Sequence, residues 1–172
     1  MRSKEIEVVV NQIEILEEIR QNVGNREATS YRKSGCRISM ANIPSERVIL
    51  DVDLASPPAS ASTNQCDYVL FYIDDIQDIL VGVPMELKSG GVKASDVLAQ
   101  LQEGARIVDD FTPKNIKIDL IPILVHNGLD KTQYDQLRTS RIIFRSDNFT
   151  INTTTCGYQG NIVEAIKKSI KR

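Results

Sequence analysis

The sequence predicts an α/β fold, or an α+β fold with a mixed sheet. Three observations predict it: two apolar runs lie close enough to pair as a hairpin, an amphipathic helix follows them, and a further apolar run follows that helix. A strand–helix–strand step requires a parallel crossover, so the sheet should contain antiparallel and parallel pairs. The length of 172 residues fits one domain spanning 1–172.

The first predicted element is a helix over 4–23, which Gly24 would end as a C-cap. Glutamates lie mostly on one side of this helix, so it is amphipathic. Apolar residues recur at helical spacing on the other side: Ile6, Val9, Ile13, Leu16 and Val23.

A polar, basic connection over 25–37 leads to three predicted strands. The segment 47–54 alternates in the manner of a strand, and 55–65 is small, polar and proline-bearing, as loops are. The runs 66–73 and 79–88 are apolar and separated by the turn 74–78, which favours a hairpin.

The second predicted helix spans 94–111, and the rest of the chain mixes strands with helices. One face of this helix is apolar, through Val97, Leu101, Ala105 and Val108. The remaining predicted elements are a buried strand 119–127, a short helix 129–138, strands 140–146 and 149–155, and a terminal helix 161–172 with a basic tail.

Composition and charge limit the function classes. Hydrophobic residues make up 41% and charged residues 26%, and the net charge of −2 gives no global attraction to nucleic acid or acidic membranes. No apolar run is long enough to span a membrane, and the N-terminus lacks a signal peptide's apolar region. The cysteines Cys36, Cys66 and Cys156 form no CxxC pair, so we expect free thiols in a reducing cytoplasm.

A pair of opposite charges ends the 79–88 strand. Glu86 and Lys88 share one strand face, whereas Leu87 points to the opposite layer. Hairpin pairing would bring Asp67, at the start of the preceding strand, beside them if the register allows. A Glu and a Lys two residues apart are most often a solvated face, but here a glycine turn and a glutamine-bearing helix follow directly.

This group of residues has a chemical interpretation. Two carboxylates and a main-chain carbonyl, such as that of Leu87, are the hard oxygen ligands that Mg²⁺ or Mn²⁺ prefers. A nearby ammonium can orient the attacking water and stabilise charge on a phosphoryl oxygen. The turn at Gly90–Gly91 and the helix N-terminus after it present N–H groups that favour an anion.

The segments "CD" at 66–67, "MELKSG" at 85–90 and "AQL" at 99–101 resemble the PD-(D/E)XK nuclease superfamily, which has the restriction-endonuclease-like fold. The resemblance covers 5–127 in architecture: helix, three strands, helix, strand. It implies that Asp67 and Glu86 bind metal, that Lys88 is the catalytic lysine and that Gln100 positions the lysine or the waters. Glu17 or Glu18 would add a carboxylate from the first helix, whereas Gln102 would be solvated. The family's proline before the aspartate is missing: the sequence at 65–67 is "QCD".

Three other kinds of site have weaker support. "KSGGVKAS" lacks the spacing of a phosphate-binding loop. A catalytic triad would have to use the single histidine, His126, and no GxSxG surrounds a serine. A zinc site from His126 and the three cysteines would draw on ligands far apart in the sequence, so buried thiols are the default.

The leading hypothesis is a metal-dependent nuclease that acts on DNA more readily than on RNA. Such nucleases often work as homodimers. The alternatives are a catalytically inactive binding module with the same fold, or a small subunit whose protein partner supplies DNA recognition. Basic residues in the 139–145 segment would contact phosphates if that segment borders the site. The cations predicted to bind nucleic acid are Arg32, Lys33, Arg37 and Lys93.

Overall fold

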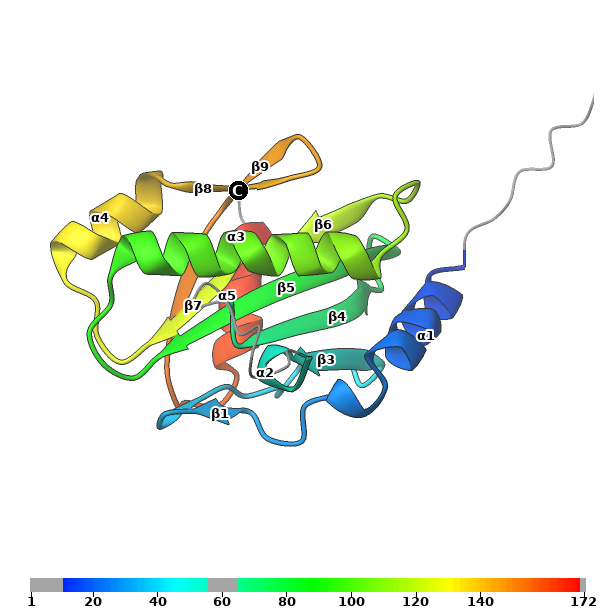
Figure 1. The fold of residues 1–172 in the computed structure, drawn as a ribbon, viewed down its shortest axis with the longest axis horizontal. Coiled ribbons are helices and arrows are strands. Elements are labelled where there is room, and N and C mark those ends of the chain that lie inside the picture. Colours follow the sequence, from blue (N-terminus) through cyan, green and yellow to red (C-terminus); the bar gives the residue numbers. More distant parts are fainter. Residues whose placement is uncertain (1–10, 56–64, 171–172) are drawn as a thin grey trace, which may run out of the picture.

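The computed structural model describes residues 11–55 and 65–170 and confirms the predicted α/β class (Figure 1). Its core is a mixed six-stranded sheet with helices packed against it. The elements are α1 (Gln12–Val23), η1 (Gly24–Arg26), β1 (Arg32–Lys33), β2 (Cys36–Arg37), β3 (Arg47–Asp51), α2 (Val52–Ala55), β4 (Tyr68–Asp74), β5 (Ile79–Lys88), α3 (Ala94–Phe111), β6 (Ile118–Leu120), β7 (Ile123–His126), α4 (Lys131–Thr139), β8 (Arg141–Phe144), β9 (Asp147–Thr150), β10 (Asn152–Thr155) and α5 (Asn161–Ile170).

The central sheet has the strand order β10-β7-β5-β4-β3, and β6 also pairs with β5. Strands β3, β4 and β5 form an antiparallel meander, so the predicted hairpin is confirmed. After α3, strands β6 and β7 both run parallel to β5, which confirms the predicted crossover. Strand β10 joins parallel to β7 and forms one edge of the sheet.

Several predicted boundaries were wrong for local reasons. The strand over 119–127 is divided into β6 and β7 around Pro122, which has no N–H for a sheet ladder. The strand over 47–54 ends at Asp51, where the short helix α2 begins. The segment 149–155 is divided at Ile151: β9 forms a separate hairpin with β8, and only β10 enters the central sheet.

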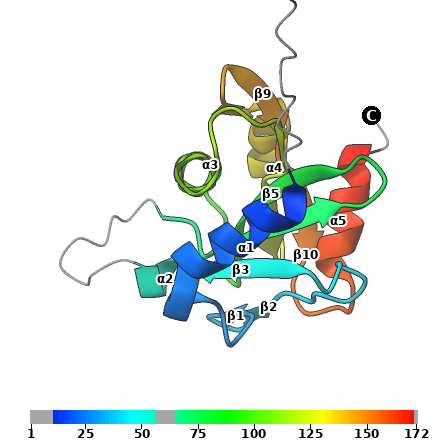
Figure 2. The same cartoon turned by 90° about the vertical axis from the view of Figure 1, so that its right-hand side faces the viewer.

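The two faces of the sheet are covered by different elements. Helices α1 and α3 pack on one face, whereas α5 and the segment 28–43 pack on the other (Figures 1 and 2). In α1 the buried residues include Leu16 and Val23, as expected, but Ile13 is 66% exposed. Asn11 caps α1, and residues 4–10 of the predicted helix lie outside the described residues.

Helix α3 lies very close to β5 because both elements carry a glycine at the contact. A Cβ atom on Gly82 would lie 2.6 Å from Cγ1 of Val108, and one on Gly104 would lie 2.5 Å from Cβ of Pro84. A step of two residues along β5, from 82 to 84, therefore corresponds to a step of about one turn along α3, from 108 to 104. The next step places Glu86 beside the turn that contains Gln100.

The cysteines depart from the expectation of free thiols. Cys36 and Cys156 form a disulfide with a Cα–Cα distance of 5.1 Å, which links β2 to the segment after β10. Only Cys66 is free among the three, and it is buried against α3. Sequence spacing gave no indication of this pairing, because the two half-cystines are 120 residues apart. Within residues 11–55 and 65–170, no helix has the length and apolar character needed to cross a membrane.

Candidate metal and nuclease centre

The structure brings Asp67 and Glu86 together. The β4–β5 register pairs Tyr68 with Met85, so the preceding residue Asp67 lies opposite Glu86. The main-chain N–H of Asp67 donates to the Met85 carbonyl at 3.0 Å, which continues the ladder to this point. Oδ2 of Asp67 accepts a 2.8 Å hydrogen bond from the N–H of Leu87. The Asp67 carboxyl is thus fixed over the end of β5.

Lys88 completes the group of charges at the strand end. Its Nζ lies 3.2 Å from Oε1 of Glu86, and its side chain is 25% exposed. Glu86 itself is 3% exposed. Its second oxygen, Oε2, is buried and has no hydrogen-bond partner among the described residues. An unsatisfied carboxylate oxygen in this position is costly unless a donor or a cation reaches it.

The electrostatics of the two carboxyls follow from burial and proximity. Burial, followed by the neighbouring charge of Asp67, raises the pKa of Glu86 to about 8, although Lys88 opposes this. Burial also raises the pKa of Asp67, against the effect of its hydrogen bond from Leu87. Two acids in such close contact cannot both ionise easily without added positive charge. The pair therefore has the character of a cation site.

The progression of contacts between β5 and α3, from 82 beside 108 to 84 beside 104, predicts that Gln100 lies on the α3 turn nearest Glu86. Its Oε1 atom is buried and has no hydrogen-bond partner among the described residues, so the side chain does not point that atom into bulk solvent. Gln102 behaves differently from the prediction. Its amide makes two hydrogen bonds to the main chain of Ile143, at 2.7 and 3.0 Å, and so fixes β8 to α3 instead of being solvated.

Among the cations predicted to bind nucleic acid, Lys33 is already engaged. Its Nζ lies 3.1 Å from Oδ1 of Asp51 and 2.8 Å from Oδ2 of Asp53. Sequence reasoning missed both aspartates as partners, because β1 and β3 are brought together only by the fold. Lys33 and Asp53 are also close enough to influence the pKa of Asp67. The other three cations are exposed: Arg32, Arg37 and Lys93.

The first-helix glutamates lie away from the centre. Glu18 borders a small cavity together with Asp110 and Phe111, at the C-terminal end of α3. Because an α-helix rises 1.5 Å per residue, that end is about 15 Å from Gln100. Glu17 accepts from Arg20 on its own helix. Neither glutamate joins Asp67 and Glu86, so the expectation of a third carboxylate from α1 was wrong.

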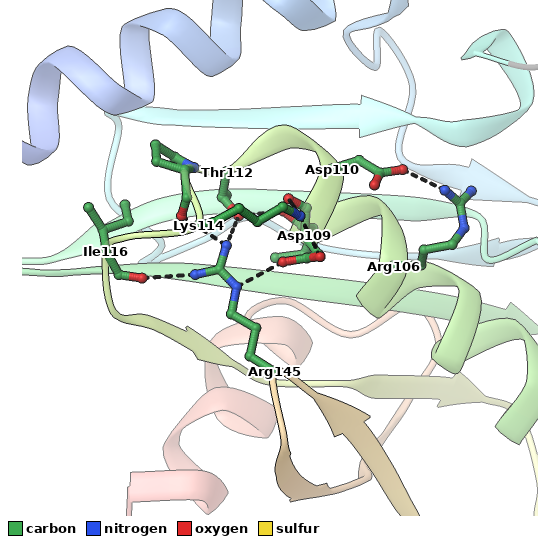
Figure 3. A network of polar contacts seen from close by, with 9 residues as sticks. Arg106, Asp109, Asp110, Thr112, Lys114, Ile116 and Arg145 are labelled. Carbon is green, nitrogen blue, oxygen red and sulfur yellow. Dashed lines mark hydrogen bonds and ion pairs between the residues drawn. The ribbon is translucent and has the colours of Figure 1, made fainter.

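In the 139–145 segment, Arg145 has a structural role and is not free to contact phosphates. Arg145, in the β8–β9 turn, donates to Oδ1 of Asp109 at 2.8 Å and to Oγ1 of Thr112 at 3.0 Å (Figure 3). It also donates to the carbonyls of Pro113 and Ile116. These contacts fix the hairpin to the C-terminal end of α3.

The N-terminus of α3 is partly occupied. Oε1 of Gln133, on α4, accepts a 2.7 Å hydrogen bond from the N–H of Ala94. One of the donors that the sequence suggested for an anion is therefore used within the protein. Lys93, the N-cap residue, makes no side-chain capping bond.

The other proposed sites find little support. A zinc site from all three cysteines and His126 is wrong, because Cys36 and Cys156 are joined to each other and Cys66 belongs to the apolar cluster on the opposite face of the sheet. Burial lowers the pKa of His126. In the described part of the chain, no group of three or more histidine, cysteine, aspartate or glutamate side chains is placed to hold a metal ion.

Comparison with known proteins adds no relative: no family model, curated protein or solved structure matches this chain.

Proposed function

We propose that the protein is a metal-dependent nuclease of the PD-(D/E)XK type, with the restriction-endonuclease-like arrangement of α1, β3, β4, β5, α3 and β7 as its core. The observation that carries the proposal is the placement of Asp67 opposite Glu86 in the β4–β5 register, with the Asp67 carboxyl held over the end of β5 beside the Lys88 ammonium. Two buried like charges are expensive, so without a cation the pair keeps a proton, and a divalent cation between the carboxyls would take the place of that proton.

The donor set fits a hard divalent cation. Asp67, Glu86 and the Leu87 carbonyl would hold Mg²⁺ or Mn²⁺ through oxygen, and Oε2 of Glu86 is a buried acceptor without a partner among the described residues. When bound, the cation would supply positive charge that neutralises the acids and polarises the scissile phosphodiester. Two protein carboxylates leave coordination positions for substrate and water, as is common for Mg²⁺.

The residues around the cation have separate tasks. The Lys88 ammonium, held 3.2 Å from Glu86, would orient the attacking water and stabilise the negative charge that develops on the phosphoryl oxygen. Gln100 is a positioning residue, whose amide would hold Glu86 or Lys88 in place from α3. The exposed cations Arg32, Arg37 and Lys93 would contact DNA phosphates without reading sequence.

Cleavage of DNA by the purified protein tests this proposal. Plasmid and single-stranded DNA should be cut in Mg²⁺ or Mn²⁺, and a chelator should stop cleavage. Asp67→Ala and Glu86→Ala should each remove cleavage. Cleavage that survives both changes, or that continues in excess chelator, would assign the activity to another site.

The second candidate is a non-catalytic DNA-binding or protein-binding module that keeps the nuclease fold. The observation that favours it is the lack, among the described residues, of a third acidic or metal-binding side chain at the centre. This module would bind DNA equally well in chelator and in Mg²⁺, and it would cut neither substrate. As a small subunit it would need a protein partner that supplies DNA recognition. The homodimer belongs to the nuclease proposal, in which each protomer would place one centre on one DNA strand.

A cytoplasmic location is part of the proposal. The Cys36–Cys156 disulfide is the observation against it, because disulfides rarely persist in reducing compartments. Thiol labelling in intact cells decides the point. Because Cys36 is buried, the protein is denatured in the presence of the labelling reagent, and a cytoplasmic protein should be labelled at Cys36 and Cys156 before any reductant is added.

A further inference from the structure

A second site lies away from the carboxylates, in an open cavity of about 650 Å³. It is bordered by α4, β8, α5 and the beginning of β10, the edge strand of the sheet. This volume is within the range of pockets that bind small molecules, roughly 300–1,000 Å³. The residues on which the argument depends are Tyr134, Arg138, Arg141, Asn152, Thr153 and Lys168.

The charges around this cavity are of one sign. Arg138, Arg141 and Lys168 border it, and none of the aspartates or glutamates within residues 11–55 and 65–170 does. None of the three forms an ion pair with a described carboxylate, although the protein as a whole carries a net charge of −2. Lys168 donates to the Thr153 carbonyl, and Arg141 donates to the carbonyls of Arg138 and Ser140. Three cations without a carboxylate partner favour an anionic ligand with more than one charge.

The walls also offer a planar surface and a fixed amide. Tyr134 is 45% exposed at the cavity, so its ring is available to stack on a planar group. Asn152 is 2% exposed, and its Nδ2 donates to the Ala165 carbonyl, which fixes the orientation of the amide. Its Oδ1 is buried and has no partner among the described residues. The Asn152 amide therefore belongs to the wall of the cavity, and the groups open to a ligand are the three cations and the Tyr134 ring.

We propose that this cavity binds a nucleoside monophosphate: Arg138, Arg141 and Lys168 hold the phosphate, and Tyr134 stacks on the base. The phosphate accounts for the three cations, and the base accounts for the exposed ring of Tyr134. This inference does not rest on the proposed nuclease function, because none of the residues at the metal centre takes part in it.

The two sites are separate in the sheet. The strand registers pair Glu86 with Leu124 and Leu124 with Thr153, so the cavity begins two strands away from the carboxylates. At a strand spacing of about 4.8 Å, this is ~10 Å across the sheet. A nucleotide in the cavity would therefore leave the space over Glu86 free.

Calorimetric titration of the full chain with thymidine monophosphate and with inorganic phosphate, both in chelator, tests the proposal. The nucleotide should bind with a Kd below about 1 mM, and inorganic phosphate at least about tenfold more weakly. Arg138→Gln and Lys168→Gln should each weaken nucleotide binding at least about tenfold. The matched controls Lys131→Gln on α4 and Lys167→Gln on α5 remove equal charge outside the cavity and should stay within about twofold of the wild type.

The contribution of the base is tested separately. Tyr134→Ser should reduce nucleotide binding by several-fold and leave inorganic phosphate unaffected, while Glu86→Gln should change neither ligand. The proposal is overturned if neither ligand saturates below about 10 mM, or if the control lysines matter as much as Arg138 and Lys168. Equal binding of phosphate and nucleotide would overturn the assignment to a nucleotide, leaving a simple anion site.

Discussion

The two ends of α3 carry polar groups in opposite states. At the C-terminal end, four groups accept hydrogen bonds from Arg145, and the hydrogen bonds from Lys114 and Arg145 lower the pKa of Asp109 (Figure 3). At the N-terminal end, burial raises the pKa of Glu86, and Oε2 of Glu86 and Oε1 of Gln100 are both without a partner among the described residues. Both regions join α3 to a neighbouring strand or hairpin, yet only one is satisfied internally.

This difference separates a structural network from a candidate site. A satisfied network stabilises the fold and gains nothing from a ligand, whereas buried acceptors without donors cost free energy until a partner arrives. The end of α3 near Glu86 is thus less stable than it would be if donors reached these two oxygens. We attribute this to a function that needs a cation there, which is a frequent reason for unfavourable local electrostatics in enzymes.

The largest expected effect comes from Lys88→Ala, which separates chemistry from metal binding. It removes a cation and no metal ligand, so DNA cleavage should fall at least ~10²-fold while Mn²⁺ binding persists. Initial rates of plasmid nicking measure the first quantity, and calorimetry measures the second. Lys131→Ala, which removes an exposed lysine on α4, should cleave at the wild-type rate. Cleavage by Lys88→Ala at that same rate would leave the strand end without a catalytic lysine.

Next in size is the loss of stability expected at the satisfied end. Arg145→Ala leaves Oδ1 of Asp109 and two carbonyls without their donor, while Lys114 still holds Oδ2 of Asp109, so the free energy of unfolding should fall by roughly 1–3 kcal/mol. Urea denaturation in chelator measures this change. Glu86→Gln should be neutral or stabilising in the same assay, because a neutral amide replaces a buried acid. If Glu86→Gln greatly lowered the free energy of unfolding, Glu86 would have a structural role, as Asp109 does at the other end of α3.

Opposite pH dependences should distinguish the two ends. Because the folded-state pKa of Glu86 is raised to about 8, the folded protein holds an extra proton between pH 4.5 and 8. The contribution of Glu86 to the free energy of unfolding is therefore complete below about pH 4.5 and is lost as the pH rises through about 8. The lowered pKa of Asp109 has the reverse sign: its contribution is present at neutral pH and is lost on acidification below the ordinary range of an aspartate.

Urea unfolding as a function of pH, in chelator, measures both trends. Glu86→Gln should flatten the decrease between pH 4.5 and 8, and Asp109→Asn should flatten the decrease at acid pH. If Glu86→Gln retains the neutral-pH decrease in full, Glu86 is already ionised in the folded protein without metal.

The smallest effect concerns DNA binding outside both ends. Arg32→Ala should weaken binding modestly and reduce the dependence of log K on log salt by about one unit, as expected for one lost phosphate contact. The rate of cleavage at saturating DNA should be unchanged. Fluorescence anisotropy at several salt concentrations gives the slope. If the slope is unchanged, Arg32 of β1 does not contact DNA phosphates.

The sequence predicted the end of α3 at Glu86 better than the end at Asp109, for physical reasons. Strand periodicity put Glu86 and Lys88 on one face, and a short hairpin could pair Asp67 with Glu86 only if the register matched, which it does. Arg145 resembled any charged residue in a polar segment. Its role depends on a β-turn that brings it to an α3 terminus 36 residues earlier in the chain. The Cys36–Cys156 disulfide and the Lys33–Asp51 pair were hidden for the same reason.

The most direct test of the central claim is calorimetric titration of Mn²⁺ into the metal-free protein at pH 7. The wild type should bind one ion and release protons, because the cation displaces the proton that Glu86 holds when its pKa is about 8. Glu86→Gln should weaken binding at least about tenfold, whereas Asp109→Asn, which removes a carboxylate at the satisfied end, should bind as the wild type does. Absence of Mn²⁺ binding to the wild type, or equal binding by Glu86→Gln and Asp109→Asn, would contradict a metal centre at Asp67 and Glu86.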